Sequence, residues 1–179
     1  MDQQENLGPA ALVELSKRVA AKVEILQIRL VQSTVKAELE RPEPPEHVRH
    51  GLQVNCVADR ETKTITVRVK FLFRAHYEDG KEPSTAPLIV DAEFMLAYQV
   101  PSLDGIEEKH IDAFAKLNGA YNAWPYWREY LQSSLTRVGL PALTVPVATI
   151  PLLMAIYSHS GMRQETWEGG KEQAAPETK

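Results

Sequence analysis

The sequence contains very little cysteine, no surplus of basic residues and no long apolar run. Cys56 is the only cysteine, so no disulfide can form within the chain, and a reducing compartment fits. The net charge of -4 disfavours a general nucleic-acid binder, because such a protein needs cations to neutralise phosphates. No apolar stretch approaches the roughly 20 residues that span a bilayer, and the first residues lack the pattern of a secretory signal. The sequence therefore predicts a cytoplasmic protein with no membrane insertion and no nucleic-acid partner.

Motifs of covalent chemistry are also missing from the sequence. There is no glycine-rich nucleotide loop, no HExxH, no CxxC and no GxSxG. His47 and His50 lie three residues apart, a spacing at which a metal site can begin, but no further cluster completes a site, so a solvated loop is the better interpretation. His76 alternates outward on a predicted strand, and we expect it to be exposed. We predict no catalytic residue, no metal and no cofactor, and a protein that is not an enzyme.

The first half of the chain changes from a helical period to a period of two. Residues 9–22 predict a short helix, and alternating apolar residues predict strands over about residues 26–40, 52–58, 65–74 and 88–98. In the first strand the apolar phase flips between Leu30 and Val35, so we expect a bulge near residues 31–34. Residues 41–51 contain three prolines and are too long for a tight hairpin, so this loop should cross between non-adjacent strands.

The second half is helical after Pro101. At the 100° per residue of an α-helix, one side of the predicted helix is apolar. Its residues are Phe114, Leu117, Tyr121, Trp124, Leu131 and Leu135. Gly139 and Pro141 end that helix, and a short apolar helix follows over residues 152–160. We predict a flexible N-terminus at residues 1–8, one domain at 9–162 and a disordered polar tail at 163–179. The order of elements predicts an α+β fold with helices on one face of an antiparallel sheet.

Five aromatic residues fall within residues 121–130, around a proline that should bend the helix. Tyr121 and Trp124 lie on the main apolar side and are expected in the core. Tyr126 and Tyr130, four residues apart, lie on the far side of the predicted helix. A second apolar face indicates a second packing partner, and we predict that Tyr126 and Tyr130 contact a neighbouring subunit. The alternative is that all five aromatic residues belong to the core.

The C-terminal half resembles the signature of SecB, the protein-export chaperone. Residues that match at the family's spacing are Gly119–Tyr121, Trp124–Tyr126, Arg128, Glu129, Gly139, Pro141, Leu143, Pro146 and Leu152–Met154. The proline loop of residues 42–48 is similar to the family's crossover loop, and the resemblance covers roughly residues 23–160. It implies a four-stranded Greek-key antiparallel sheet with two C-terminal helices on one face, to which the short N-terminal helix is added.

The resemblance also implies a function, which is to hold precursor polypeptides unfolded, without ATP, along apolar grooves. The family assembles as a dimer of dimers, so a homo-oligomer is implied here. Residues implied to bind polypeptide are Pro45, Val48, Trp124, Trp127, Leu131, Leu152, Leu153, Ile156 and Tyr157. Exposed apolar patches suit this task because they bind many extended segments with little sequence preference.

Export members also pass cargo to the translocase motor through acidic residues on the outer sheet face. Asp91 and Glu93 fall near the matching strand position, and the alternative is that they pair with neighbouring basic residues of the sheet. The N-terminal helix and the aromatic stretch at 126–130 are more similar to the SecB-like chaperones of toxin–antitoxin systems. The expected clients are therefore unfolded preproteins or an antitoxin. A small-molecule binder and a purely structural oligomer are the alternatives from other classes.

Overall fold

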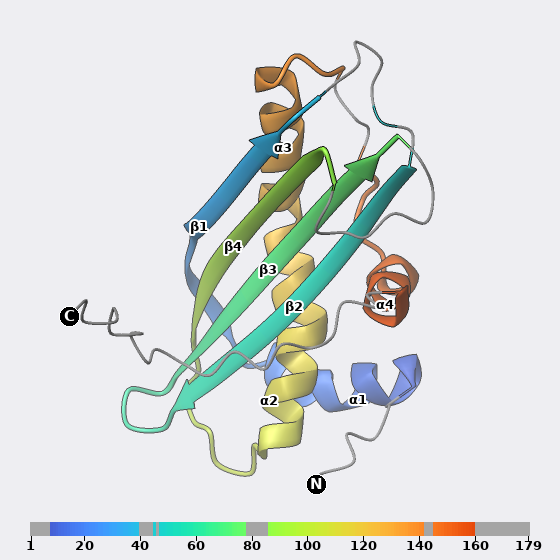
Figure 1. The fold of residues 1–179 in the computed structure, drawn as a ribbon. Helices are drawn as coiled ribbons and strands as arrows, with labels where there is room; N and C mark the ends of the chain where they lie inside the picture. The colour runs from blue at the N-terminus through green and yellow to red at the C-terminus, as the bar shows by residue number, and fades with distance from the viewer. Residues whose placement is uncertain (1–7, 40–44, 46, 78–85, 142–144, 160–179) are drawn as a thin grey trace, which may run out of the picture.

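The chain forms one four-stranded sheet with a helical layer on one face (Figure 1). The computed structural model describes residues 8–39, 45, 47–77, 86–141 and 145–159. The strands are β1 (Glu24–Ala37), β2 (His47–Asp59), β3 (Thr64–His76) and β4 (Leu88–Gln99). The helices are α1 (Pro9–Ala20), α2 (Glu108–Phe114), α3 (Ala120–Arg137) and α4 (Ile150–His159), and the π-helical turn η2 (Ala115–Gly119) joins α2 to α3. The predicted tail at residues 163–179 and all but the last residue of the predicted flexible N-terminus at residues 1–8 lie outside the described residues.

The strand order is β1-β4-β3-β2, and all neighbours are antiparallel. Three strands form consecutive hairpins, and β1 returns beside β4, which is the Greek-key arrangement. The predicted crossing between non-adjacent strands is therefore confirmed, since β1 and β2 lie at opposite edges of the sheet (Figure 1). The predicted loop was too long, because residues 47–51, with His47 and His50, belong to β2. The fold class predicted from the sequence is confirmed.

The predicted bulge in the first strand is also confirmed. The register of β1 against β4 shifts between Leu30 and Gln32, within the expected segment, and a second shift that the pattern did not predict lies between Ile25 and Gln27. Each bulge puts one extra residue into β1, so apolar residues before and after it can face the same side of the sheet.

The core lies between the inner faces of β3 and β4 and the helical layer. Alternate residues of both strands are buried, as the period of two predicts. Phe71 stacks on Trp127 of α3 with ring centroids 5.2 Å apart and an interplanar angle of 8°, and it meets Trp124 edge-to-face at 5.7 Å. Towards the other end, Tyr98 meets Phe114 of α2 edge-to-face at 4.9 Å. These aromatic pairs fix the helical layer against the centre of the sheet.

The π-helical turn η2 changes which side of the helical layer faces the sheet. A π turn holds one more residue than an α turn, so the apolar stripe shifts round the helix after it. Tyr121, predicted in the core, is therefore 50% exposed, while Ala120, Ala123 and Trp127 face the sheet. The prediction for Tyr121 was wrong and that for Trp124 is confirmed, because Trp124 is buried. The helix continues through Pro125.

The two edges of the sheet are covered unequally. The helix α4 lies beside β2 (Figure 1). At the other edge, nearly every side chain of β1 is exposed. Ile25, Leu30 and Val35 face the helical side, opposite the buried Tyr98, Phe94 and Val90 of β4, yet all three are more than 40% exposed. The helical layer therefore covers the centre of the sheet and leaves the inner face of β1 bare.

No helix in the described parts of the chain combines the length and the apolar character that crossing a membrane requires.

Candidate functional site

The first and last residues of the predicted polypeptide-binding set lie close to two elements, β2 and α4. Val48, next to the first residue of β2, pairs with Ala75 on the inner side of the sheet and is 44% exposed, while Pro45 is half-buried. At the far end of the set, Thr149 caps α4, because its Oγ1 accepts a hydrogen bond of 3.2 Å from the Leu152 amide. The cap starts α4 beside β2, so residues from both ends of the set lie at the same edge of the sheet (Figure 1).

The three α3 residues of the predicted set lie inside the protomer. Trp124, Trp127 and Leu131 are buried in the main core. Trp124 also donates a hydrogen bond of 2.8 Å from Nε1 to the carbonyl of Pro146, which ties the loop before α4 to the helix. In the isolated chain these residues therefore support the surface, and direct contact with a polypeptide would require the core to open.

The α4 residues of the set divide into two groups. Leu153 and Ile156 are buried in the main core, whereas Leu152 is half-buried at its edge. The side chain of Tyr157 lies outside the described part of the structure. A role for any residue of this set in binding polypeptide stays a prediction.

Two exposed apolar residues next to α4 were missing from the sequence-based set. Val147 is 66% exposed in the loop before α4, and Ile150 at its first turn is 38% exposed. The signal that could have identified them is the absence of Asp, Glu, Lys and Arg from Val138 to Met162. A segment of that length with no charge and several exposed apolar residues is unusual for a solvated surface.

Two histidines at the β2–β3 end hold ring nitrogens away from solvent. His76 was expected to be exposed, but its side chain is only 3% exposed, so that prediction was wrong. Nε2 of His76 and Nδ1 of His50 are buried and find no hydrogen-bond partner among the described residues. Burial lowers the pKa of both rings, and for His76 the cations Arg49 and Arg74 and the neighbouring His47 lower the pKa further. Among the described residues no group of His, Cys, Asp and Glu is arranged to hold a metal ion.

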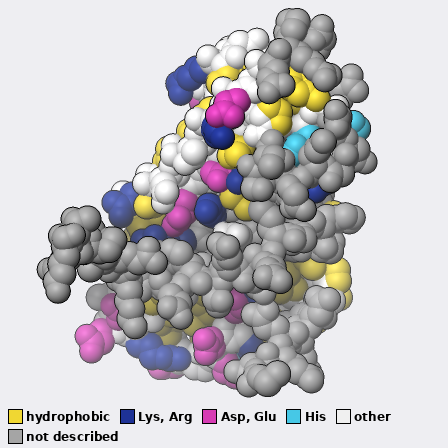
Figure 2. Space-filling model, in the orientation of Figure 1, with side chains coloured by type: hydrophobic (Ala, Val, Ile, Leu, Met, Phe, Trp, Pro, Cys, Tyr) yellow, Lys and Arg dark blue, Asp and Glu magenta, His cyan; other side chains and the backbone are white. Residues whose placement is uncertain are grey.

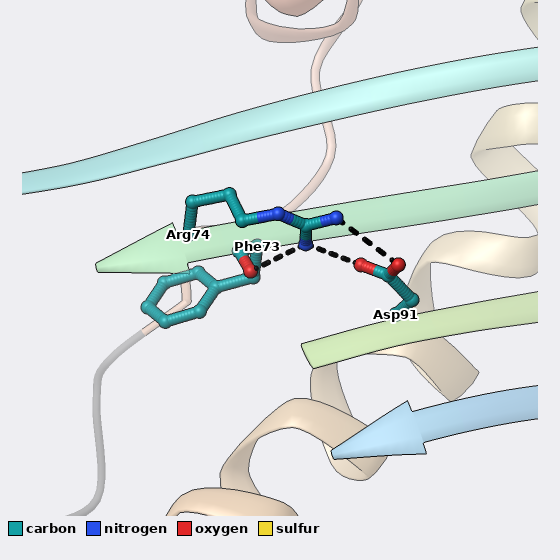
Figure 3. A network of polar contacts seen from close by, with 3 residues as sticks. All are labelled: Phe73, Arg74 and Asp91. Carbon is teal, nitrogen blue, oxygen red and sulfur yellow. Dashed lines mark hydrogen bonds and ion pairs between the residues drawn. The ribbon is translucent and has the colours of Figure 1, made fainter. Parts of the chain in front are cut away.

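The outer face of the sheet carries ion pairs that engage both predicted motor-binding carboxylates. Asp91 accepts hydrogen bonds from both terminal nitrogens of Arg74, one of them at 3.1 Å (Figure 3). Glu93 accepts one of 3.1 Å from Arg68. The alternative interpretation, cross-strand pairing, is therefore confirmed for both residues. Figure 2 shows basic and acidic side chains interspersed over this face.

A shallow depression on the outer face holds ≈ 70 Å³ and is lined by polar side chains that include Gln32, Lys70 and Glu93. Small-molecule sites usually enclose at least about 300 Å³ and are mostly apolar. This depression therefore does not support the small-molecule alternative.

The two tyrosines predicted at a subunit interface do not lie on one separate face. Tyr130 is half-buried and packs against the core, with its ring 6.5 Å from that of Trp127. Tyr126 is about half exposed, and its ring lies 6.3 Å from that of Phe94 on β4. Phe94 pairs with Leu30, so Tyr126 lies next to the bare inner face of β1. Their contact with a second subunit stays a prediction.

Two of three comparisons with known proteins, the curated relatives and the solved structures, give SecB-like chaperones. No family model matches the chain. The SecB-like chaperones Rv1957 and MT2006 of two Mycobacterium tuberculosis strains are each 26% identical to it over 156 residues, which is 79% of this chain and 86% of each relative. The solved structure of Rv1957, in complex with a ChAD peptide from the Rv1956 HigA1 antitoxin, matches with a TM-score of 0.65 at 23% identity. That match covers 79% of this chain and 98% of the other.

Proposed function

We propose that this chain, whose resemblance to SecB-like chaperones the relatives confirm, holds unfolded polypeptide without ATP, with an antitoxin as one client. The observation that carries the proposal is the uncharged segment of residues 138–162, in which Val147 and Ile150 are exposed beside the core. Apolar side chains bind by surface area and not by directed bonds, so such a surface accepts many extended segments. The antitoxin is proposed because Rv1957 was solved with an antitoxin peptide.

Delivery of cargo to a translocase motor is the less supported part of the proposal. A basic partner that docks on Asp91 and Glu93 would have to compete with Arg74 and Arg68, which already hold both carboxylates. Breaking such an ion pair leaves the carboxylate and the arginine without their opposite charge, so the motor would have to supply equivalent contacts. We therefore propose clients of the antitoxin type before preproteins for export.

We also propose that the protein works as a homo-oligomer, with a dimer of dimers as the expected form. The bare inner face of β1, made by Ile25, Leu30 and Val35, is the surface proposed for contact between copies. An exposed edge strand of this length carries unpaired backbone groups that would otherwise recruit other chains. Tyr126 lies next to this face and would be covered with it.

The test is light scattering from a chemically unfolded, aggregating protein diluted with and without the chain, in the absence of ATP. The variant Val147→Glu/Ile150→Glu places two charges on the proposed surface, while Val57→Glu places one at an apolar residue that is 71% exposed on the outer sheet face. We expect near-stoichiometric suppression by the wild type and by Val57→Glu, and loss of suppression in the double variant. Equal suppression by all three would exclude the α4 surface. No suppression by a folded wild type would leave the holdase without support.

A purely structural oligomer is the second candidate, because Trp124, Trp127 and Leu131 are buried inside the protomer. The light-scattering assay distinguishes this hypothesis from the holdase. A purely structural oligomer would be folded but would leave the aggregation of every unfolded protein unchanged.

A further inference from the structure

The helix α1 occupies an apolar strip that lies apart from the main core. Leu12 of α1 is buried in a small cluster with Ala113 of α2 and Leu117 of η2, and Met154 of α4 packs against its edge. Leu12, Ser16 and Val19 follow one another at helical spacing on the buried side of α1. The strip of Ala113, Leu117 and Met154 is therefore shaped to receive an amphipathic helix.

The two ends of α1 are held differently. Val19 is fully buried in the main core, so the C-terminal end is anchored just before the turn into β1. The N-terminal end begins at Gly8 without a side-chain cap and without an acidic residue in the first turn. Ser16 donates a hydrogen bond to Asn118 of η2, and Lys17 pairs with Glu14 inside α1 itself.

A helix of 12 residues is marginal alone, so α1 depends on its seat in the strip. Segments that bury few apolar side chains open at lower free energy than the rest of a fold. Around the anchor at Val19, the first turns of α1 can therefore leave the strip while the main core stays closed. Met154 lies on α4, so the uncovered strip would continue the surface proposed to hold clients.

We propose that α1 is a displaceable cover, and that an amphipathic helical segment of a client takes its place on the strip of Ala113, Leu117 and Met154. This inference rests on the proposed function, because it assumes that the surface at α4 receives polypeptide. It commits to a helical segment because the strip holds a helix in the closed state, with Leu12 as its central apolar contact. Recognition of this kind uses apolar anchors three or four residues apart.

The first test locks α1 in place. Ser16 and Asn118 are joined by a side-chain hydrogen bond, so Ser16→Cys/Asn118→Cys in a Cys56→Ser background is oxidised, and the fraction that mass spectrometry shows to be cross-linked serves as the protein with the strip closed. The probe is a fluorescent peptide with the sequence of residues 8–22, and the control is the same peptide with Leu12→Asp. We expect the reduced protein to bind the probe and the oxidised protein to bind it at least about tenfold more weakly, because a closed strip must open before it can bind. Equal binding by both states would overturn the proposal, as would equal binding of the control peptide.

The second test loosens α1. Leu12→Ser removes its central apolar contact, and Ala11→Ser changes an exposed neighbour on the same helix. We expect Leu12→Ser to bind the probe about fivefold more tightly than the wild type, since the open state becomes more populated, and Ala11→Ser to be unchanged. No gain for Leu12→Ser would count against displacement.

The two proposals fail separately in these experiments. Suppression of aggregation that is equal in the oxidised and reduced locked protein keeps the holdase and rejects the cover. The reverse result is probe binding that is weaker in the oxidised than in the reduced protein, together with no suppression of aggregation by either. It would support α1 as the cover of a helix-binding surface and reject the holdase.

Discussion

At the scale of single residues, Gly119 permits a close approach of the helical layer to the sheet. A Cβ at this position would lie 2.7 Å from Cγ1 of Val67 on β3, which is too close for unaltered packing. We expect Gly119→Ala to lower the free energy of unfolding by about 1–2 kcal/mol, because overpacking costs more than the roughly 1 kcal/mol that alanine gains in helix propensity. Urea denaturation measures the change.

The matched control for this prediction is the double variant Gly119→Ala/Val67→Ala. Val67→Ala removes the methyl group that the new Cβ would meet, so Gly119→Ala should cost less in that background than alone. A cost that is the same in both backgrounds would show that the contact between Gly119 and Val67 is not the cause.

Cys56 should be a slow nucleophile. Burial and, to a lesser extent, the charge of Asp112 raise the pKa of its thiol to about 11 from an ordinary value of 9.0. Since the thiolate is the reacting form, alkylation near pH 8 should be about 100-fold slower than for a thiol with the ordinary pKa. The rate of iodoacetamide labelling checks this, with the urea-unfolded protein as the reference. A native rate equal to the unfolded rate would contradict it.

At the scale of elements, His50 on β2 and His76 on β3 should make the free energy of unfolding depend on pH. The folded-state pKa of His50 and His76 is lowered from 6.5, so below that pH the unfolded chain binds more protons than the folded one. Stability present at neutral pH is therefore lost as the pH falls through about 6.5 towards the folded pKa values. Urea midpoints should fall between about pH 7.5 and pH 5.5, and the fall should be smaller in His50→Gln and in His76→Gln. An unchanged slope in both variants would reject these rings as the source.

The elements themselves were largely predictable, and the exceptions have physical causes. Alternation fixed the strands, and the phase flip after Leu30 predicted the bulge, because a period of two assigns each residue to a face. The π-helical turn was not predicted, since no residue type marks it and a single extra residue shifts the stripe. Tyr121 was misplaced for that reason. His76 alternates outward as predicted, and only its burial in the folded chain was missed.

The candidate site was less predictable than the fold, because apolar side chains are used both to fill the core and to bind a client. Trp127, Leu131 and Leu153 are apolar enough to bind a client and equally apolar enough to fill the core, and the structure places them in the core. Val147, which is exposed, is no more apolar than these three, so composition could not rank it first. Only the missing charge over residues 138–162 separated this region from the rest of the surface.

At the scale of the whole molecule, we predict that charge on the inner face of β1 reduces the size of the assembly. Leu30→Lys/Val35→Lys places two cations on the bare surface, and burying them between copies without partners is costly. Gln27→Lys, on the outer face of the same strand, is the control. Light scattering after size-exclusion chromatography should give a lower mass for the double variant and the wild-type mass for the control. A wild-type mass for both would place the interface elsewhere.

The exposed edge strand also bears on the working concentration of the protein. A protomer released by dilution would present β1 with apolar side chains on its inner face and unpaired backbone groups along its edge. Such a protomer has the same features as the aggregating chains that the assembly is proposed to hold. Dissociated copies would then compete with clients for the intact assembly, so the capacity of the chaperone should fall more steeply than its concentration when it is diluted.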